Sequence, residues 1–200
     1  MKNYRIESLK NIFYALVLLC IFVALSSCVS TKNNTVLDKV YVTNTKTVNV
    51  LPLSYYGDVV DDVVLLTVKT KDESFNFVTY LQSDESSIYL SIMNDFGVEM
   101  GSLYYDGVSV DLNCDLFPKS LKGVYLVNDI QNIFYSSDAV RENLEASKLD
   151  FTVDIADNSV TKRIMNGSKV VEEIKITDNV IILSNLLRGY EYSITFTGSN

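Results

Sequence analysis

The sequence contains no histidine, and this absence excludes several kinds of catalytic and metal-binding site. Histidine is the commonest general base and the commonest metal ligand in proteins. Ser-His-Asp and Cys-His arrangements and nearly all usual zinc sites are therefore ruled out. Glycan hydrolysis by paired carboxylates needs two acids at a set separation within a cleft, and no spacing of the acids here suggests such a pair. We expect no enzyme, no catalytic residue, no metal and no cofactor.

Cysteine is also scarce, with only Cys20, Cys28 and Cys114 in the chain. Cys20 lies in an N-terminal apolar run, and Cys28 follows that run. Only Cys114 would remain as a thiol in a mature domain, so no internal disulfide is expected. Because its neighbours include Asp111 and Asp115, we expect a small buried apolar side chain rather than a reactive thiol.

The N-terminus has the layout of a bacterial secretory signal. Lys2, Arg5 and Lys10 precede the apolar run from Ile12 to Leu25. That run is shorter than the roughly 20 apolar residues that a membrane-spanning helix needs. An uncleaved signal anchor is the alternative, but the short run favours a cleaved signal peptide over residues 1–27.

The tetrapeptide Leu25-Ser26-Ser27-Cys28 is typical of a lipobox. It predicts that Cys28 becomes the first residue and carries two or three acyl chains, palmitate among them. Several chains hold a protein firmly, because each buried methylene contributes about 0.8 kcal/mol. Val29 follows the cysteine where Asp would retain a lipoprotein in the inner membrane under the enterobacterial pattern. We therefore expect a lipid-anchored protein of the cell outer membrane that faces the periplasm.

The remaining chain is acidic. The net charge is −8, and loss of residues 1–27 removes three bases and one acid, which brings it to −10. Such a surface is repelled by nucleic acid and by anionic head groups, so membrane contact is expected through the lipid and no nucleic-acid partner is expected. We expect a monomer with a lipidated N-terminus and tether over 28–50 and one domain over 51–200, a usual size for a single core.

Most of the domain has the pattern of short β-strands, which are rich in Val, Ile, Leu, Tyr and Phe and are separated by turn residues. Asn166-Gly167 is a strong hairpin signal because both residues accept positive φ. Consecutive strands at short spacing should pair as an antiparallel meander. The ten predicted strands are Val63 to Thr70, Phe75 to Gln82, Ser87 to Asn94, Val98 to Tyr105, Val108 to Leu112, Phe151 to Ile155, Val160 to Met165, Lys169 to Thr177, Val180 to Ser184 and Tyr190 to Thr197.

The stretch from Leu121 to Leu149 interrupts this pattern. Val127, Ile130, Ile133 and Phe134 recur at helical spacing, which predicts a helix. A second helix should begin at Ser137, whose side chain can cap it, with Asp138 in the first turn. Because strands lie on both sides of this insertion, and several are apolar on both faces, we expect an open, curved sheet with the helices across its mouth.

Several segments, in order, resemble the outer-membrane lipoprotein receptor LolB and a family of LolB-like bacterial lipoproteins that bear a domain of unknown function. They span most of residues 75–197. The matching residues are Asn94-Asp95-Phe96-Gly97 between two strands, Tyr105-Asp106-Gly107, Phe117-Pro118, Leu126 to Phe134, Arg163, Asn166-Gly167, Ile174, Leu183-Ser184-Asn185 and Gly189-Tyr190.

The resemblance implies a mainly β (α+β) fold, a LolA/LolB-like incomplete antiparallel β-barrel of about ten strands with a helical lid and an apolar cavity for acyl chains. Phe96 matches the protruding residue of LolB that assists delivery into the membrane, although Asp95 replaces a proline there. Two interpretations of Phe96 remain open: it is the tip of a membrane-probe loop, or it is a turn residue folded back onto the sheet. The cavity or lid candidates are Leu90, Ile92, Leu103, Leu126, Val127, Ile130, Ile133 and Phe134; core packing explains the helical ones equally well.

Two functions remain open from the sequence. The first is binding of lipid or a lipidated client in the cavity, for envelope transport or sorting and without covalent chemistry. The alternative is a structural or assembly lipoprotein that binds another envelope protein. Arg163 and Arg188 are the only arginines in the strand-rich C-terminal third. Either would suit a lipid head group, and either would equally suit a surface ion pair.

Overall fold

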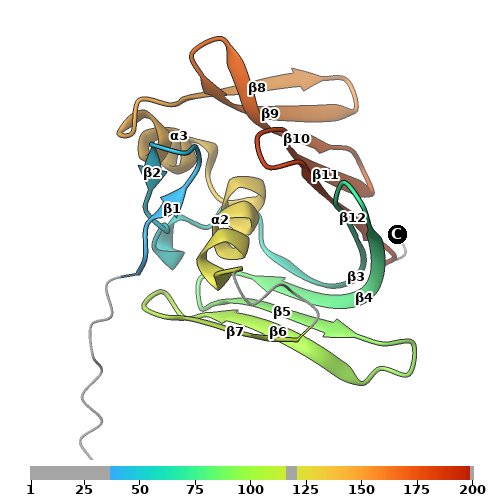
Figure 1. The fold of residues 1–200 in the computed structure, drawn as a ribbon. Coiled ribbons are helices and arrows are strands. Elements are labelled where there is room, and N and C mark those ends of the chain that lie inside the picture. Colours follow the sequence, from blue (N-terminus) through green and yellow to red (C-terminus); the bar gives the residue numbers. More distant parts are fainter. Residues whose placement is uncertain (1–36, 116–120, 199–200) are drawn as a thin grey trace, which may run out of the picture. The chain divides into compact units, whose positions relative to one another are not determined.

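The computed structural model describes residues 37–115 and 121–198 of the chain (Figure 1). They belong to a compact unit that runs from Thr35 to Asn200. The predicted signal peptide and the lipidation site Cys28 lie outside the described residues. Among the helices that are described, none has the length and apolar character needed to cross a membrane.

Ten strands form one antiparallel sheet in the order β7-β6-β5-β4-β3-β12-β11-β10-β9-β8. Strands that follow one another in the chain pair, apart from β7 and β8, and the pairing of β12 with β3 joins the two halves. The sheet is open because β7 and β8 end the order. This arrangement confirms the predicted incomplete barrel. The strands are β3 (Val60–Lys69), β4 (Ser74–Ser83), β5 (Ile88–Met93), β6 (Glu99–Tyr105), β7 (Val110–Cys114), β8 (Asp150–Ala156), β9 (Ser159–Asn166), β10 (Lys169–Ile176), β11 (Val180–Asn185) and β12 (Tyr190–Phe196).

The register defines an inner face of the sheet, which packs on the core, and an outer face. In β5, Leu90 pairs with Leu103 and Ile92 with Gly101, so these residues share the inner face. Leu103 and Ile92 are completely buried. Side chains alternate between faces along a strand. The alternation seen in the sequence therefore becomes an inner face of apolar side chains that need a cover.

Helix α2 (Gly123–Phe134) supplies that cover and lies across the inner face of the sheet, which curves around it (Figure 1). All but one of its residues are buried, because the sheet encloses the helix on several sides. Helix α3 (Ser137–Glu145) follows after a short break. Both predicted helices are thus confirmed.

The start of α3 differs from the prediction in one detail. Asp138 lies in the first turn as expected, but Ser137 is the first helical residue and Ser136 is the N-cap. At this end of α3, which the structure describes, the N-cap residue makes no side-chain capping hydrogen bond, and Ser137 is not the capping residue. The backbone N–H of Ser136 instead donates to Tyr55 O at 3.1 Å, so the break between the helices is tied to the segment before β3.

The described part of the segment expected to form a tether packs against the domain. It forms a small sheet from β1 (Val40–Tyr41) and β2 (Thr47–Val48). Val40 and Val48 are buried in the core. A 3-10 helix, η1 (Leu53–Tyr55), then leads to β3. The packed domain therefore begins before residue 50.

Gln131 of α2 fastens this segment to the core. Its side-chain amide accepts a hydrogen bond from Leu51 N at 2.9 Å and donates one to Leu51 O at 2.8 Å. The phenol of Tyr105 also donates to Leu51 O, at 2.9 Å. Gln131 is 1% exposed, and without it the buried N–H of Leu51 would lack an acceptor, whereas Leu51 O would keep the phenol of Tyr105.

We predict that Gln131→Ala lowers the free energy of unfolding by about 2–4 kcal/mol, because a buried N–H loses its only acceptor and a cavity forms. Urea unfolding of the Thr35–Asn200 unit measures this, with Glu145→Ala at the exposed end of α3 as the control. A loss below about 1 kcal/mol for Gln131→Ala would show that the segment is held by its valines alone.

Candidate functional site

A pocket of about 350 Å³ opens between the start of α2 and the strands β3 and β12. We call it the mouth pocket. A second, apolar hollow of about 50 Å³ lies against it, and the two share Val68 and Tyr192. We call this one the inner hollow. The mouth pocket is lined by Val68, Thr70, Leu121, Tyr125, Arg188, Tyr190 and Tyr192, and the inner hollow by Leu66, Val68, Leu90, Leu126, Asp129, Ile130, Ile133, Tyr192 and Ile194.

The aromatic wall of the mouth pocket follows from strand periodicity. Tyr190 and Tyr192 are two residues apart on β12 and both face inward, with ring centroids 5.0 Å apart. Tyr125 faces them from the first turn of α2. Tyr190 and Tyr192 are half-buried, so their rings are shared between the core and the pocket.

Arg188 stands at the rim of the mouth pocket in the turn between β11 and β12. Its guanidinium carbon lies 5.3 Å from the centroid of the Tyr125 ring, a cation–π distance. The guanidinium also donates to Tyr41 O, and the backbone N–H of Arg188 donates to Asn185 Oδ1 at 2.9 Å. Gly189 follows with φ +74, which closes the turn in a conformation that favours glycine.

The structure brings four of the predicted cavity residues together around the inner hollow. Leu90 reaches it from β5, and Leu126, Ile130 and Ile133 reach it from one side of α2. The other four, Ile92, Leu103, Val127 and Phe134, are buried and do not line this hollow. Val127 and Phe134 are thus core residues alone, whereas Leu126, Ile130 and Ile133 belong to the core and also border the hollow.

Phe96 lies in the turn between β5 and β6 and exposes 90% of its surface. The side chain of Asn94 organises this turn by accepting hydrogen bonds from Phe96 N at 2.9 Å and Val98 N at 3.0 Å. Gly97 has φ +74. Because Asn94 and Gly97 hold the turn, the ring of Phe96 projects into solvent and is not folded back onto the sheet.

A buried polar network lies behind the mouth pocket, and sequence reasoning missed it. Glu172 of β10 accepts hydrogen bonds from Asn132 Nδ2 of α2 at 3.0 Å and from Asn185 Nδ2 of β11 at 3.1 Å. The phenol of Tyr190 donates to Asp129 Oδ2 of α2 at 2.9 Å. Asp129 and Glu172 are only 5% and 3% exposed. The network therefore attaches the helix to three strands of the sheet.

Burial sets the protonation of this network. It raises the pKa of Asp129 well above its usual value, and the negative charge of Glu172 raises it further. Burial raises the pKa of Glu172 to about 7, although the two amide donors favour its charged form. Burial and the two acids also raise the pKa of Tyr190, so its phenol stays protonated. Burial therefore favours the neutral form of Asp129, whereas the two amide donors favour the charged form of Glu172.

Lys162 of β9 is a second buried charge beneath α2. Its Nζ donates to Ile133 O at 2.6 Å, at the C-terminal end of the helix. Burial lowers the pKa of Lys162, while the charge of Asp58 acts in the opposite direction. A cation at this end of a helix interacts favourably with the unpaired carbonyls and the helix dipole.

The missed residues carried one weak signal in the sequence. Glu172 and Glu173 are adjacent within a strand, and adjacent strand residues face opposite sides, so one of the two had to face inward. Pairing of Glu172 with Asn185 puts Glu172 on the inner face. Asp129 and Asn132 are three residues apart on α2 and therefore lie on one side of the helix. Only the fold shows that these acids meet.

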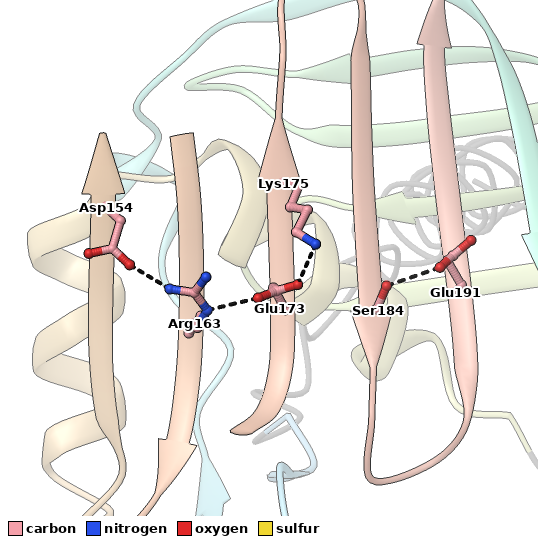
Figure 2. A network of polar contacts seen from close by, with 6 residues as sticks. All are labelled: Asp154, Arg163, Glu173, Lys175, Ser184 and Glu191. Atoms are coloured by element: carbon pink, nitrogen blue, oxygen red, sulfur yellow. Dashed lines mark hydrogen bonds and ion pairs between the residues drawn. The ribbon is translucent and has the colours of Figure 1, made fainter. Parts of the chain in front are cut away.

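Arg163, the other arginine considered from the sequence, lies on the outer face. Figure 2 shows it between Asp154 of β8 and Glu173 of β10, with Lys175 also contacting Glu173. The distance from Arg163 Nε to Glu173 Oε2 is 2.7 Å. The same face carries the hydrogen bond from Ser184 to Glu191 (Figure 2). Arg163 is thus a surface ion-pair residue, and Arg188 is the arginine at the pocket.

We predict that Asp129→Asn makes stability less dependent on pH. The pKa of Asp129 is raised by folding, so the unfolded chain loses this proton first as pH rises above about 4. Stability therefore falls as the pH increases towards the raised pKa in the folded state. An amide keeps the hydrogen bond from Tyr190 and carries no charge.

Urea unfolding between pH 5 and pH 8 measures this effect. We expect Asp129→Asn to be more stable than the wild type at pH 8 and to give a shallower slope. Asp111→Asn, an exposed acid on β7, serves as the control and should follow the wild type. Parallel pH profiles for wild type and Asp129→Asn would contradict the assignment of the proton.

The family model described as protein of unknown function (DUF3261) matches residues 63–197, which cover the ten-stranded sheet from within β3 to the end of β12 and both helices. No curated protein matches the chain.

Proposed function

The chain belongs to the DUF3261 family, and we propose that it holds an acyl chain of a lipid or of a lipidated client between its sheet and α2. In this proposal the protein works by reversible partition, without covalent chemistry. Its relationship to LolB stays a prediction. The observation that carries the proposal is the continuity of the mouth pocket with an apolar hollow beneath the helix.

Size and chemistry support a small apolar ligand. The mouth pocket, at about 350 Å³, falls at the lower end of the range of small-molecule sites, which is about 300–1,000 Å³. Its walls are mostly apolar or aromatic, and those of the inner hollow are apolar apart from Asp129. Transfer of hydrocarbon from water to such walls contributes about 25 cal/mol per Å² of buried apolar area.

Helix α2 acts as the lid in this proposal. Leu126, Ile130 and Ile133 form its side of the inner hollow, and Leu66, Leu90 and Ile194 form the opposite side. At about 50 Å³ the closed hollow holds only a short piece of chain. A small outward movement of α2 would lengthen the apolar path without breaking any strand pairing.

The predicted anchor and the exposed turn support a place at a membrane. Lipidation of Cys28 would hold the domain at the outer membrane, on its periplasmic side. Phe96 would then contact the membrane as a probe, as the resemblance implies, because its ring is exposed and its turn is ordered. An exposed aromatic ring gains free energy on entering the interface between head groups and acyl chains.

The second candidate is a structural or assembly lipoprotein that binds another envelope protein. The outer face of the sheet favours it, because Val63, Leu65, Val78 and Tyr104 are exposed there. Exposed apolar side chains that gather on one face mark interaction sites. We prefer the function of an acyl-chain carrier, because core residues themselves form the apolar hollow on the inner face.

The proposed carrier function predicts that acyl species co-purify with the protein. We would export the Thr35–Asn200 unit, which contains the whole described core, and analyse it by native mass spectrometry and lipid extraction. Leu90→Trp fills the inner hollow and should remove most of the bound acyl species. Tyr104→Trp adds an indole on the outer face and should leave them unchanged. An acyl-free wild type with a stable crosslinked protein partner would favour the second candidate.

The probe function predicts that Phe96→Glu weakens attachment to vesicles. Burying one aromatic ring contributes about 1.5–3 kcal/mol, so we expect a loss of about tenfold or more in vesicle partitioning. Co-sedimentation of the Thr35–Asn200 unit with phosphatidylcholine vesicles measures it. Ile155→Glu, at an exposed position of the edge strand β8, is the matched control. Equal losses for the two variants, or none for Phe96→Glu, would remove Phe96 as a membrane probe.

A further inference from the structure

Arg188 is a cation without an acidic partner at the opening of the proposed ligand site. Its side chain is exposed at the rim of the mouth pocket, and no ion pair to it occurs within residues 37–115 and 121–198. The chain as a whole has an excess of acids over bases, with 25 against 17. In so acidic a protein, a solvent-accessible arginine left unpaired at a pocket has charge available for a ligand.

The guanidinium is held in a fixed place. It lies over the ring of Tyr125, and one of its N–H groups donates to Tyr41 O. A guanidinium has five N–H donors, so others remain for a ligand. Because its backbone is also held by Asn185, Arg188 loses little conformational freedom when it binds.

The acids behind the pocket do not cancel this charge. The nearest of them, Asp129, is separated from the pocket by the phenol of Tyr190, which donates to it. Burial and the charge of Glu172 raise the pKa of Asp129, which favours its neutral form, although the hydrogen bond from Tyr190 and the charge of Arg188 act in the opposite direction. Glu172 is bonded to two amides deeper in the core. The base at the start of α2, Lys122, is paired with Asp38 at 2.7 Å, which leaves Arg188 as the positive group on the pocket lining.

We infer that the mouth pocket binds the anionic head of a single acyl chain, with Arg188 contacting the carboxylate or phosphate and the chain running past Tyr190 and Tyr192 towards the inner hollow. The inference rests on the proposed function and adds the chemical class of the head group. A planar guanidinium matches carboxylate and phosphate oxygens in a two-point contact. The aromatic rings below Arg188 accept the first methylenes of the chain.

Three ligands with the same ten-carbon chain test the head group: decanoate, 1-decanol and decyltrimethylammonium. Calorimetric titration of the Thr35–Asn200 unit below the critical micelle concentrations gives each affinity. We expect decanoate to bind about tenfold more tightly than 1-decanol, and decyltrimethylammonium to bind most weakly. Acetate at the same concentrations separates binding of the whole amphiphile from binding of a free anion, and we expect no measurable heat from it.

The variants assign the preference to Arg188. Arg188→Gln should reduce decanoate binding about tenfold and leave 1-decanol binding unchanged, which also shows that the pocket remains folded. Arg188→Lys keeps the charge and should retain part of the preference. Arg163→Gln removes an arginine from the outer face and should alter neither affinity.

The outcomes separate the inference from the proposed function. Equal affinities for decanoate and 1-decanol in the wild type, or a preference for the cationic ligand, would overturn the anionic site and leave the acyl carrier standing. If acetate bound as tightly as decanoate, the ligand of the site would be a free anion and not an amphiphile. If none of the ten-carbon ligands bound, both the proposed carrier function and the head-group site would be wrong.

Discussion

The packing of α2 against the inner face of an unclosed sheet is the constraint on which the rest of the structure depends. Ten strands present an apolar inner face, and in the part of the chain that the structure describes the other sheet has only the two short strands β1 and β2. One helix has to fill the space, which explains why nearly all of its residues are buried. A helix of fixed width cannot match a curved sheet everywhere, and the mouth pocket and inner hollow lie where the fit is incomplete.

The polar network is the unusual part of this packing. A buried carboxylate is costly unless it is hydrogen-bonded, and Glu172 receives amide donors from both the helix and the sheet. An apolar contact would hold α2 in many similar positions. Hydrogen bonds between Asn132, Glu172 and Asn185 are directional, so they specify one position of the helix over the strands. The network thus fixes the position of the lid, although Asp129 and Glu172 make that position sensitive to proton concentration.

Local patterns in the sequence were sufficient for the strands of the large sheet and for both helices, but not for β1, β2 and η1 or for the site. Alternation and turn residues predicted all ten strands, and the spacing of Val127, Ile130, Ile133 and Phe134 predicted α2, because these signals depend on neighbours in the chain. The pairing of β12 with β3, residues far apart in sequence, decides which side chains line the mouth pocket. Tyr125 meets Arg188 and Tyr190 only through the packing of α2 against the sheet, so their meeting could not be predicted.

The two ends of α2 are fastened in different ways, and this difference sets the direction in which the helix can move. At its C-terminal end, Phe134 O accepts from the backbone of Gly57 and Asp58, and Ile133 O accepts from the buried Lys162. At its start, Lys122 is linked to Asp38 by an ion pair in solvent, a kind of contact that contributes little. Sliding along the axis would break the buried bonds. Rotation about the C-terminal end would preserve them, would stretch the hydrogen bond between Tyr190 and Asp129, and would widen the space beside Tyr125 first.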